Sequence, residues 1–125
     1  MARRILVVED DEKSRRLLRD VLEFHGFDVC AVPTGEEGLA GARECCPDAE
    51  LLDIELPGIS GFDVLSRLKS ESASAALPVI AVTASVMDQD RRKILAAGFD
   101  AYVPKPVNIR ELVTILNELL SKNEP

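Results

Sequence analysis

Apolar residues along the chain fall into short runs, separated by stretches in which apolar positions recur at helical spacing. Short apolar runs rich in β-branched side chains are typical of strands covered on both faces. Apolar positions three or four residues apart are typical of helices with one buried face. The pattern predicts strands at 5–8, 27–32, 49–54, 78–83 and 99–103, and helices at 13–25, 35–46, 62–70, 87–97 and 109–121.

Residues that begin or end helices stand between these segments. Gly26 and Gly98 follow two predicted helices, and Pro47 ends a third. Thr34 is suited to cap the helix that follows it, with Glu37 in the capping-box position. Five β/α units thus fill residues 1–125 as one α/β domain, with a mostly parallel sheet and helices on both faces.

Composition narrows the classes of function. The net charge of -7 over 125 residues disfavours direct binding of nucleic acid phosphates. No apolar run approaches the roughly 20 residues that a membrane helix needs, so no membrane insertion is expected. An odd set of cysteines, Cys30, Cys45 and Cys46, has no disulfide or metal-binding spacing and predicts reduced thiols in a cytoplasmic protein.

Polar residues stand where four of the predicted strands end. Glu9 and Asp10 follow the first strand, Asp53 and Thr83 end the third and fourth, and Lys105 follows the fifth. Ligands of open α/β sheets bind at the carboxyl ends of the strands. Three converging carboxylates repel one another unless a cation is present, and hard oxygen ligands suit Mg²⁺. With a lysine and a hydroxyl beside them, they suit an aspartyl-phosphate site.

Each of these residues also has a structural interpretation. Asp10 or Asp11 could cap the first helix, Thr83 could cap the fourth, and Lys105 could be an ordinary surface lysine. Capping alone does not explain why all the residues stand at strand ends. The set therefore favours the functional interpretation.

Four short motifs around these residues resemble the response regulator receiver family, which is CheY-like. They are ILVVED at 5–10, LLDIELPG at 51–58, VTA at 82–84 and KP at 105–106. They occur in the family's order and spacing, and the resemblance covers essentially the whole chain. It implies a flavodoxin-like (βα)5 sandwich of three layers, with a parallel five-stranded sheet in the order 2-1-3-4-5.

The resemblance also implies roles for individual residues. Asp53 resembles the phosphoacceptor. Asp10 resembles a direct ligand of Mg²⁺ or Mn²⁺, Glu9 one that acts through water, and the backbone carbonyl of Glu55 completes the protein ligands of the metal. Lys105 would pair with the phosphoryl group, and the Lys105–Pro106 bond is expected to be cis.

Two further residues resemble the family's switch. Thr83 corresponds to the hydroxyl that moves to the phosphoryl group, and Tyr102 to the aromatic that turns inward with it. Tyr102 could instead simply pack on the last strand with its hydroxyl in water. In the family, residues corresponding to 86–120 form the surface that signals, and the first helix commonly docks the phosphodonor.

These features predict a two-component phosphorelay protein rather than a turnover enzyme. It would assist its own phosphorylation and dephosphorylation. The expected partners are a histidine kinase or histidine phosphotransfer protein and a downstream protein target. Residues 87–107 resemble DivK-like single-domain regulators and hybrid-kinase receivers more than winged-helix transcription factors. A free-standing regulator is favoured over a receiver excised from a larger protein.

Two other classes compete with this interpretation. A Mg²⁺-dependent phosphohydrolase would usually place its nucleophile after the first strand and would carry a substrate cap. A flavodoxin-like FMN module would need a hydroxyl- and glycine-rich loop after the first strand, and more aromatic residues. Both fit the chain less well than a receiver.

Glu50 departs from the receiver pattern, which usually has aliphatic residues in the run before the phosphoacceptor. This position should be buried in a doubly covered sheet, and an unpaired buried carboxylate is costly. We expect Glu50 either to lie at an exposed start of the strand or to have a buried partner.

Overall fold

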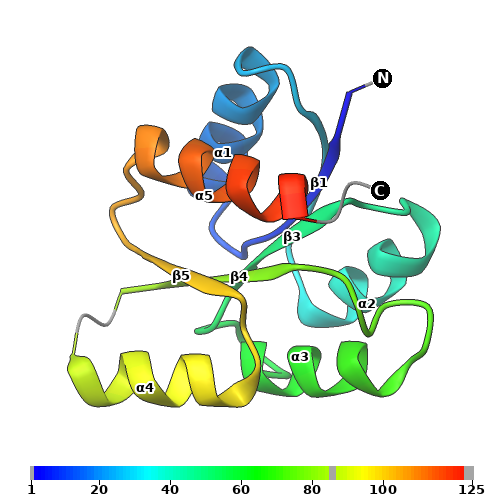
Figure 1. Ribbon diagram of the computed structural model, residues 1–125, viewed down its shortest axis with the longest axis vertical. Helices are drawn as coiled ribbons and strands as arrows, with labels where there is room; N and C mark the ends of the chain where they lie inside the picture. The colour runs from blue at the N-terminus through cyan, green and yellow to red at the C-terminus, as the bar shows by residue number, and fades with distance from the viewer. Residues whose placement is uncertain (1, 85–86, 123–125) are drawn as a thin grey trace.

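The computed structural model describes residues 2–84 and 87–122 and contains five strands that alternate with five helices (Figure 1). The strands are β1 (Arg4–Val8), β2 (Asp28–Val32), β3 (Ala49–Asp53), β4 (Val79–Thr83) and β5 (Ala101–Pro104). The helices are α1 (Glu12–Phe24), α2 (Gly35–Glu44), α3 (Gly61–Ser70), α4 (Asp88–Ala97) and α5 (Ile109–Lys122). Every predicted element is present, and most boundaries lie within one or two residues of the prediction. In the described part of the chain, no helix is long and apolar enough to cross a bilayer.

The strands form one parallel sheet in the order β2-β1-β3-β4-β5, which confirms the predicted flavodoxin-like topology. β2 pairs with one edge of β1, and β3 pairs with the opposite edge. The order in which strands are added to the sheet therefore switches from one side of β1 to the other after β2. The carboxyl ends of β1 and β3 are therefore neighbours, and a ligand site is expected between them.

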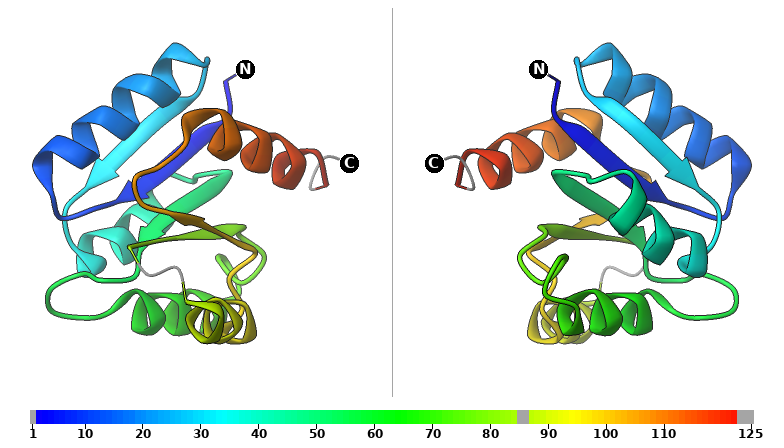
Figure 2. Two further views of the ribbon diagram at one scale, coloured as in Figure 1. Left: turned by 90° about the vertical axis from the view of Figure 1, so that its left-hand side faces the viewer. Right: turned by 90° about the vertical axis from the view of Figure 1, so that its right-hand side faces the viewer.

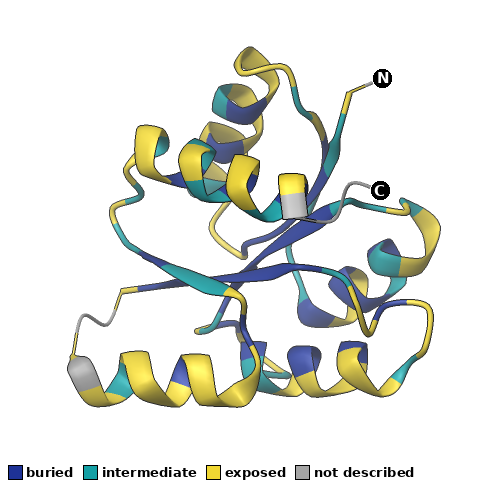
Figure 3. Cartoon of the chain, viewed as in Figure 1, coloured by how far each residue is buried: buried dark blue, intermediate teal, exposed yellow. Residues whose placement is uncertain are grey.

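Two apolar cores lie on opposite faces of this sheet. Helices cover each of these faces (Figures 1 and 2). Ile5 and Val7 of β1 point toward α1 and α5, whereas Leu6 and Val8 point toward α2, α3 and α4. Both faces of the central strands are thus covered, and Figure 3 shows these strands as buried along most of their length. This explains why the strands read as continuous apolar runs.

Side chains cap four helices in the described part of the chain, and at α5 the side chain of Asn108 accepts from the N–H of Glu111 at 3.1 Å. Thr34 accepts a hydrogen bond from the backbone N–H of Glu37 at the start of α2, as predicted. Ser60 and Asp63 form a reciprocal capping box at the start of α3. Asp11 caps α1, where its carboxylate accepts a hydrogen bond from the N–H of Ser14 at 2.9 Å. Asp10 is therefore free of the capping role.

The last strand begins two residues later than predicted. Gly98 ends α4 with φ +112°, and the side chain of Asp100 then accepts a hydrogen bond from the N–H of Val79 at 2.8 Å. Phe99 points into the core, where its ring packs edge-to-face on Phe62. Phe99 is therefore apolar because it packs in the core, although it lies before the first residue of β5.

Candidate functional site

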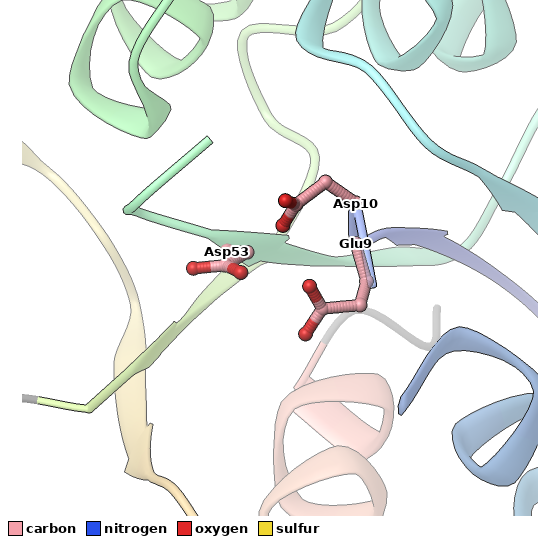
Figure 4. Close-up of side chains that lie close together, drawn as sticks. All are labelled: Glu9, Asp10 and Asp53. Carbon is pink, nitrogen blue, oxygen red and sulfur yellow. The ribbon is translucent and has the colours of Figure 1, made fainter. Parts of the chain in front are cut away.

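Three carboxylates meet at the carboxyl ends of β1 and β3 (Figure 4). Glu9 and Asp10 follow β1, and Asp53 is the last residue of β3. One oxygen from each carboxylate lies within 4.8 Å of the others. Glu9 and Asp53 are buried, whereas Asp10 is exposed, so the cluster opens to solvent on one side. The structure brings together the three acidic residues that the sequence singled out.

Lys105 places a positive charge between two of these carboxylates. Its Nζ lies 2.9 Å from Oε1 of Glu9 and 2.9 Å from Oδ2 of Asp53. The Lys105–Pro106 peptide bond is cis, as expected. The backbone N–H of Lys105 also donates to the carbonyl of Thr83 at 2.8 Å, which ties the β5–α5 loop to the end of β4.

The electrostatics follow from burial and close approach. Burial raises the pKa of Glu9 to about 7, and neighbouring Asp53 adds to this, although the hydrogen bond from Lys105 opposes it. Burial alone would lower the pKa of Lys105. Hydrogen bonds to Glu9 and Asp53 outweigh this effect and raise the pKa, so the lysine stays charged. With three carboxylates and one lysine, the site has an excess of negative charge when all are ionised, so it favours the binding of a cation.

The loop after β3 holds the Asp53 side chain in place. Oδ1 of Asp53 accepts a hydrogen bond from the N–H of Glu55 at 2.9 Å, and the N–H of Ile54 donates to the carbonyl of Val82. A Cβ atom at Gly61 would lie 2.7 Å from Cα of Ile54, so only glycine fits where α3 approaches this loop. One carboxylate oxygen of Asp53 thus faces the loop, and the other faces Lys105.

Two polar side chains near the site were missed by the sequence analysis. The carboxylate of Glu55 accepts a hydrogen bond from the N–H of Ala84 at 3.2 Å, although only its carbonyl had been considered. Arg15 donates from Nη1 to the carbonyl of Glu9 at 3.0 Å. The first contact has no local sequence signal because it joins residues 29 apart in the chain. The second spans six residues, from the end of β1 to the first turns of α1.

Thr83 is buried at the end of β4 beside this cluster, where it pairs in register with Pro104 of β5. It does not cap α4, because the N-cap residue of that helix is Met87. Tyr102 is half-buried against the core between the sheet and α2–α4, and the guanidinium of Arg91 lies 5.2 Å from the centre of its ring. Thr83 and Tyr102 lie on neighbouring strands.

Glu50 contradicts both expectations for its environment. It is the second residue of β3, lies in register with Leu6 and Val79, and has 0% of its surface exposed. Neither carboxylate oxygen has a hydrogen-bond partner among the residues that the structure describes. Burial raises the pKa of Glu50 to about 8, so the side chain avoids the cost of a buried charge by keeping its proton at neutral pH.

A small groove joins the acidic cluster to α1. It has a volume of about 240 Å³ and is lined by the charged side chains of Glu9 and Lys105 and by several apolar side chains. Leu17 of α1, which is 60% exposed, lines it together with Val107 and Ile109 of the β5–α5 region. An apolar surface therefore begins next to the charged site.

Comparison with known proteins defines the class of protein. Residues 5–117 match the family model described as the response regulator receiver domain, and the chain belongs to this family. It is a receiver domain of a two-component system, a class of signalling domain. Among its relatives is the polar-differentiation response regulator DivK of Brucella ovis, which is 37% identical over 120 residues. That match covers 96% of this chain and 98% of the relative.

Solved structures show the same fold. A CheY-like response regulator receiver domain protein from Methanospirillum hungatei has a TM-score of 0.86 at 34% identity, over 98% of this chain and 96% of that one. The receiver domain of a sensor histidine kinase from Pseudomonas aeruginosa has a TM-score of 0.89 at 29% identity, over 97% of this chain and 99% of that one. The latter holds a magnesium ion in its active-site cleft.

Proposed function

We propose that this receiver accepts a phosphoryl group on Asp53 in a Mg²⁺-dependent reaction and signals through the resulting change in conformation. One observation carries the proposal. The carboxylate of Asp53 has a lysine ammonium 2.9 Å away and clusters with two further carboxylates at the carboxyl ends of β1 and β3. A nucleophile, a fixed positive charge and a set of metal ligands are what phosphoryl transfer to a carboxylate requires.

The residues present fit a divalent cation. One lysine leaves the three clustered carboxylates short of positive charge when all are ionised, and oxygen ligands suit Mg²⁺ or Mn²⁺. Asp10 and Asp53 would hold the ion directly, Glu9 would act through water, and the backbone carbonyl of Glu55 would complete the set. The bound ion would neutralise charge on the phosphoryl oxygens. The magnesium ion in the cleft of the Pseudomonas receiver supports this assignment.

The transfer itself asks little covalent chemistry of the protein. A carboxylate oxygen of Asp53 attacks the phosphorus of a phosphohistidine, the P–O bond forms, and the P–N bond to the imidazole breaks. The freed histidine nitrogen leaves with the electron pair. Lys105 is already paired with Asp53, and its ammonium group then hydrogen-bonds to the phosphoryl oxygens and stabilises their negative charge. Glu55 positions the acceptor through its N–H.

The signal follows from the new group on Asp53. A phosphoryl group brings extra acceptor oxygens to the end of β3, and the Thr83 hydroxyl on the neighbouring strand can donate to it. Movement of Thr83 would let Tyr102 turn inward. This would break its contact with Arg91 of α4 and so couple the site to that helix. The proposed signalling surface spans 86–120, of which residue 86 lies outside the described residues.

The same site defines the expected partners. The apolar groove at Leu17 and Val107 lies beside Asp53's partner Lys105, where the helix of a histidine kinase or phosphotransfer protein could dock. The match to almost the full length of the Brucella DivK relatives supports a DivK-like mode of action by protein contact. The Pseudomonas receiver, which has the same fold, is part of a sensor histidine kinase. The proposed role of Asp53 is therefore the same whether this chain acts as a free-standing regulator or as a receiver within a larger kinase.

Phosphorylation with a small donor tests the proposal. Incubation with acetyl phosphate and Mg²⁺ should add one phosphoryl group per chain, which hydroxylamine should remove because acyl phosphates are labile to it. Chelation of the metal should prevent labelling. Intact-mass measurement and release of inorganic phosphate distinguish the alternatives. Rapid release of many phosphates per chain would instead indicate a phosphohydrolase.

Replacement of Lys105 by methionine should slow phosphorylation by acetyl phosphate by about 10²–10³-fold, the usual effect of removing one donor that stabilises developing charge. The chain should remain folded in Mg²⁺, since the metal can offset Glu9 and Asp53. Lys13→Met, which changes an exposed lysine of α1, is the matched control. A Lys105→Met rate equal to that of the control would show that the lysine is not part of the site.

A further inference from the structure

Two thiols lie together between β2 and α2, away from the phosphorylation site. Cys30 is in the middle of β2, in register with Leu6 of β1, and its side chain packs against the core on the α2 side of the sheet. Cys45 is the C-cap residue of α2. Both are half-buried, and the two thiols are close enough to influence each other's ionisation.

Arg4 shows independently that β2 and the end of α2 meet here. Its Nε donates to the carboxylate of Asp28 at 3.1 Å, and its Nη1 donates to the carbonyl of Cys45 at 2.6 Å. Asp28 and Cys30 are two residues apart on one strand and so point to the same face of the sheet. One guanidinium therefore joins the Cys30 face of β2 to the residue that carries the second thiol.

The two thiols differ in their surroundings. Arg4 covers the carbonyl of Cys45 at the end of α2. Burial raises the pKa of the Cys30 thiol to about 11, and the neighbouring Cys45 side chain adds to this. Cys30 is thus a poor first nucleophile at neutral pH, and the first attack falls to Cys45.

We propose that Cys30 and Cys45 form a redox-responsive dithiol that closes to a disulfide when it meets a small-molecule disulfide oxidant. The Cys45 sulfur attacks one sulfur of the oxidant, whose S–S bond breaks and releases one thiolate. The Cys30 sulfur then attacks Cys45 in the mixed disulfide and releases the second thiolate. The two cysteine thiols lose two protons, and two electrons pass to the oxidant.

Cys46 provides the internal comparison. It follows Cys45 directly but is exposed, has φ +48°, and directs its sulfur to the carbonyl of Arg43 at 3.7 Å rather than to Cys30. It should therefore form mixed disulfides with the oxidant but should not close a bond to Cys30. The new bond would join an edge strand to the helix beside it, and it is independent of the proposed chemistry at Asp53.

Thiol mapping of the full chain tests the proposal. The wild type and Cys46→Ser are incubated with oxidised glutathione, free thiols are alkylated, and peptides are analysed by mass spectrometry without reduction. Both proteins should contain a Cys30–Cys45 link that dithiothreitol reverses. Cys30→Ser should stop at the mixed disulfide on Cys45. Because the wild type itself reports the link, the test does not depend on any variant folding.

Three outcomes would overturn the proposal. Cys30 and Cys45 could both remain open to alkylation while Cys46 of the same wild-type sample carries glutathione. The link could instead join Cys45 to Cys46. Finally, the disulfide could form only between chains, which non-reducing electrophoresis of the wild type and Cys46→Ser would reveal.

Discussion

Asp53→Asn should reduce phosphorylation by acetyl phosphate to background, a loss on the order of 10³-fold or more, as for other removals of a nucleophile. The amide keeps the size of the side chain but cannot form an acyl phosphate. It also removes one of the three clustered carboxylates, so metal affinity should fall as well. Phosphoryl incorporation by intact mass and metal affinity by calorimetry measure the two effects.

The fold should survive this replacement, which makes the result interpretable. Lys105 keeps its partner Glu9, and an asparagine oxygen can still accept from the N–H of Glu55. Asp20→Asn, at an exposed position of α1, is the matched control and should be phosphorylated like the wild type. Hydroxylamine-labile incorporation that persists in a folded Asp53→Asn protein would place the acceptor on another residue.

Glu50→Val should stabilise the chain by roughly 5 kcal/mol at pH 8 and above. The wild-type carboxyl group is fully buried and has no hydrogen-bond partner among the described residues, and burial raises its pKa to about 8 from an ordinary value of 4.5. At 1.36 kcal/mol per unit, this difference corresponds to roughly 5 kcal/mol. Valine is close to glutamate in volume and fits a strand that is covered on both faces. Urea denaturation at several pH values measures the gain.

The pH dependence has a definite sign. Because the folded-state pKa is raised, the unfolded chain releases this proton first as the pH rises. The wild type should therefore lose stability from about pH 4.5 to pH 8, the window between the two pKa values, and the loss should level off above it. The slope due to Glu50 within the window approaches about 1.4 kcal/mol per pH unit.

Glu50→Gln isolates the charge from the packing. It keeps a polar side chain in the core but cannot ionise, so the Glu50 part of the slope should vanish while a neutral cost of burial remains. Glu118→Gln, at an exposed position of α5, should leave the slope unchanged. If Glu50→Gln and Glu118→Gln follow the same pH profile, the carboxyl group of Glu50 is not protonated in the folded chain.

The sequence was sufficient to predict the order and type of the elements. β-Branched apolar runs such as Ile5–Val8 report burial on both faces of a strand, and residues such as Thr34 and Gly98 mark helix ends through local backbone chemistry. Local signals of this kind act over a few residues, so they can be read directly. The start of β5 was misplaced because an apolar residue, Phe99, packs in the core without belonging to the strand.

The acidic cluster was also accessible from the sequence, because parallel strands place their carboxyl ends at one edge of the sheet. Glu9, Asp10, Asp53 and Lys105 each follow or end a predicted strand, and that rule alone brings them together. Their assigned roles came from the resemblance to receivers and remain for the experiments above to test.

Tertiary structure alone decided the partners of side chains that meet across elements. The bond between Glu55 and the N–H of Ala84 and the pairing of Cys30 with Cys45 depend on how separate segments pack, which no local pattern encodes. Glu50 is the clearest case. Its sequence neighbours place it in a strand, but only the packing of both sheet faces seals its carboxyl group from water and from every described partner.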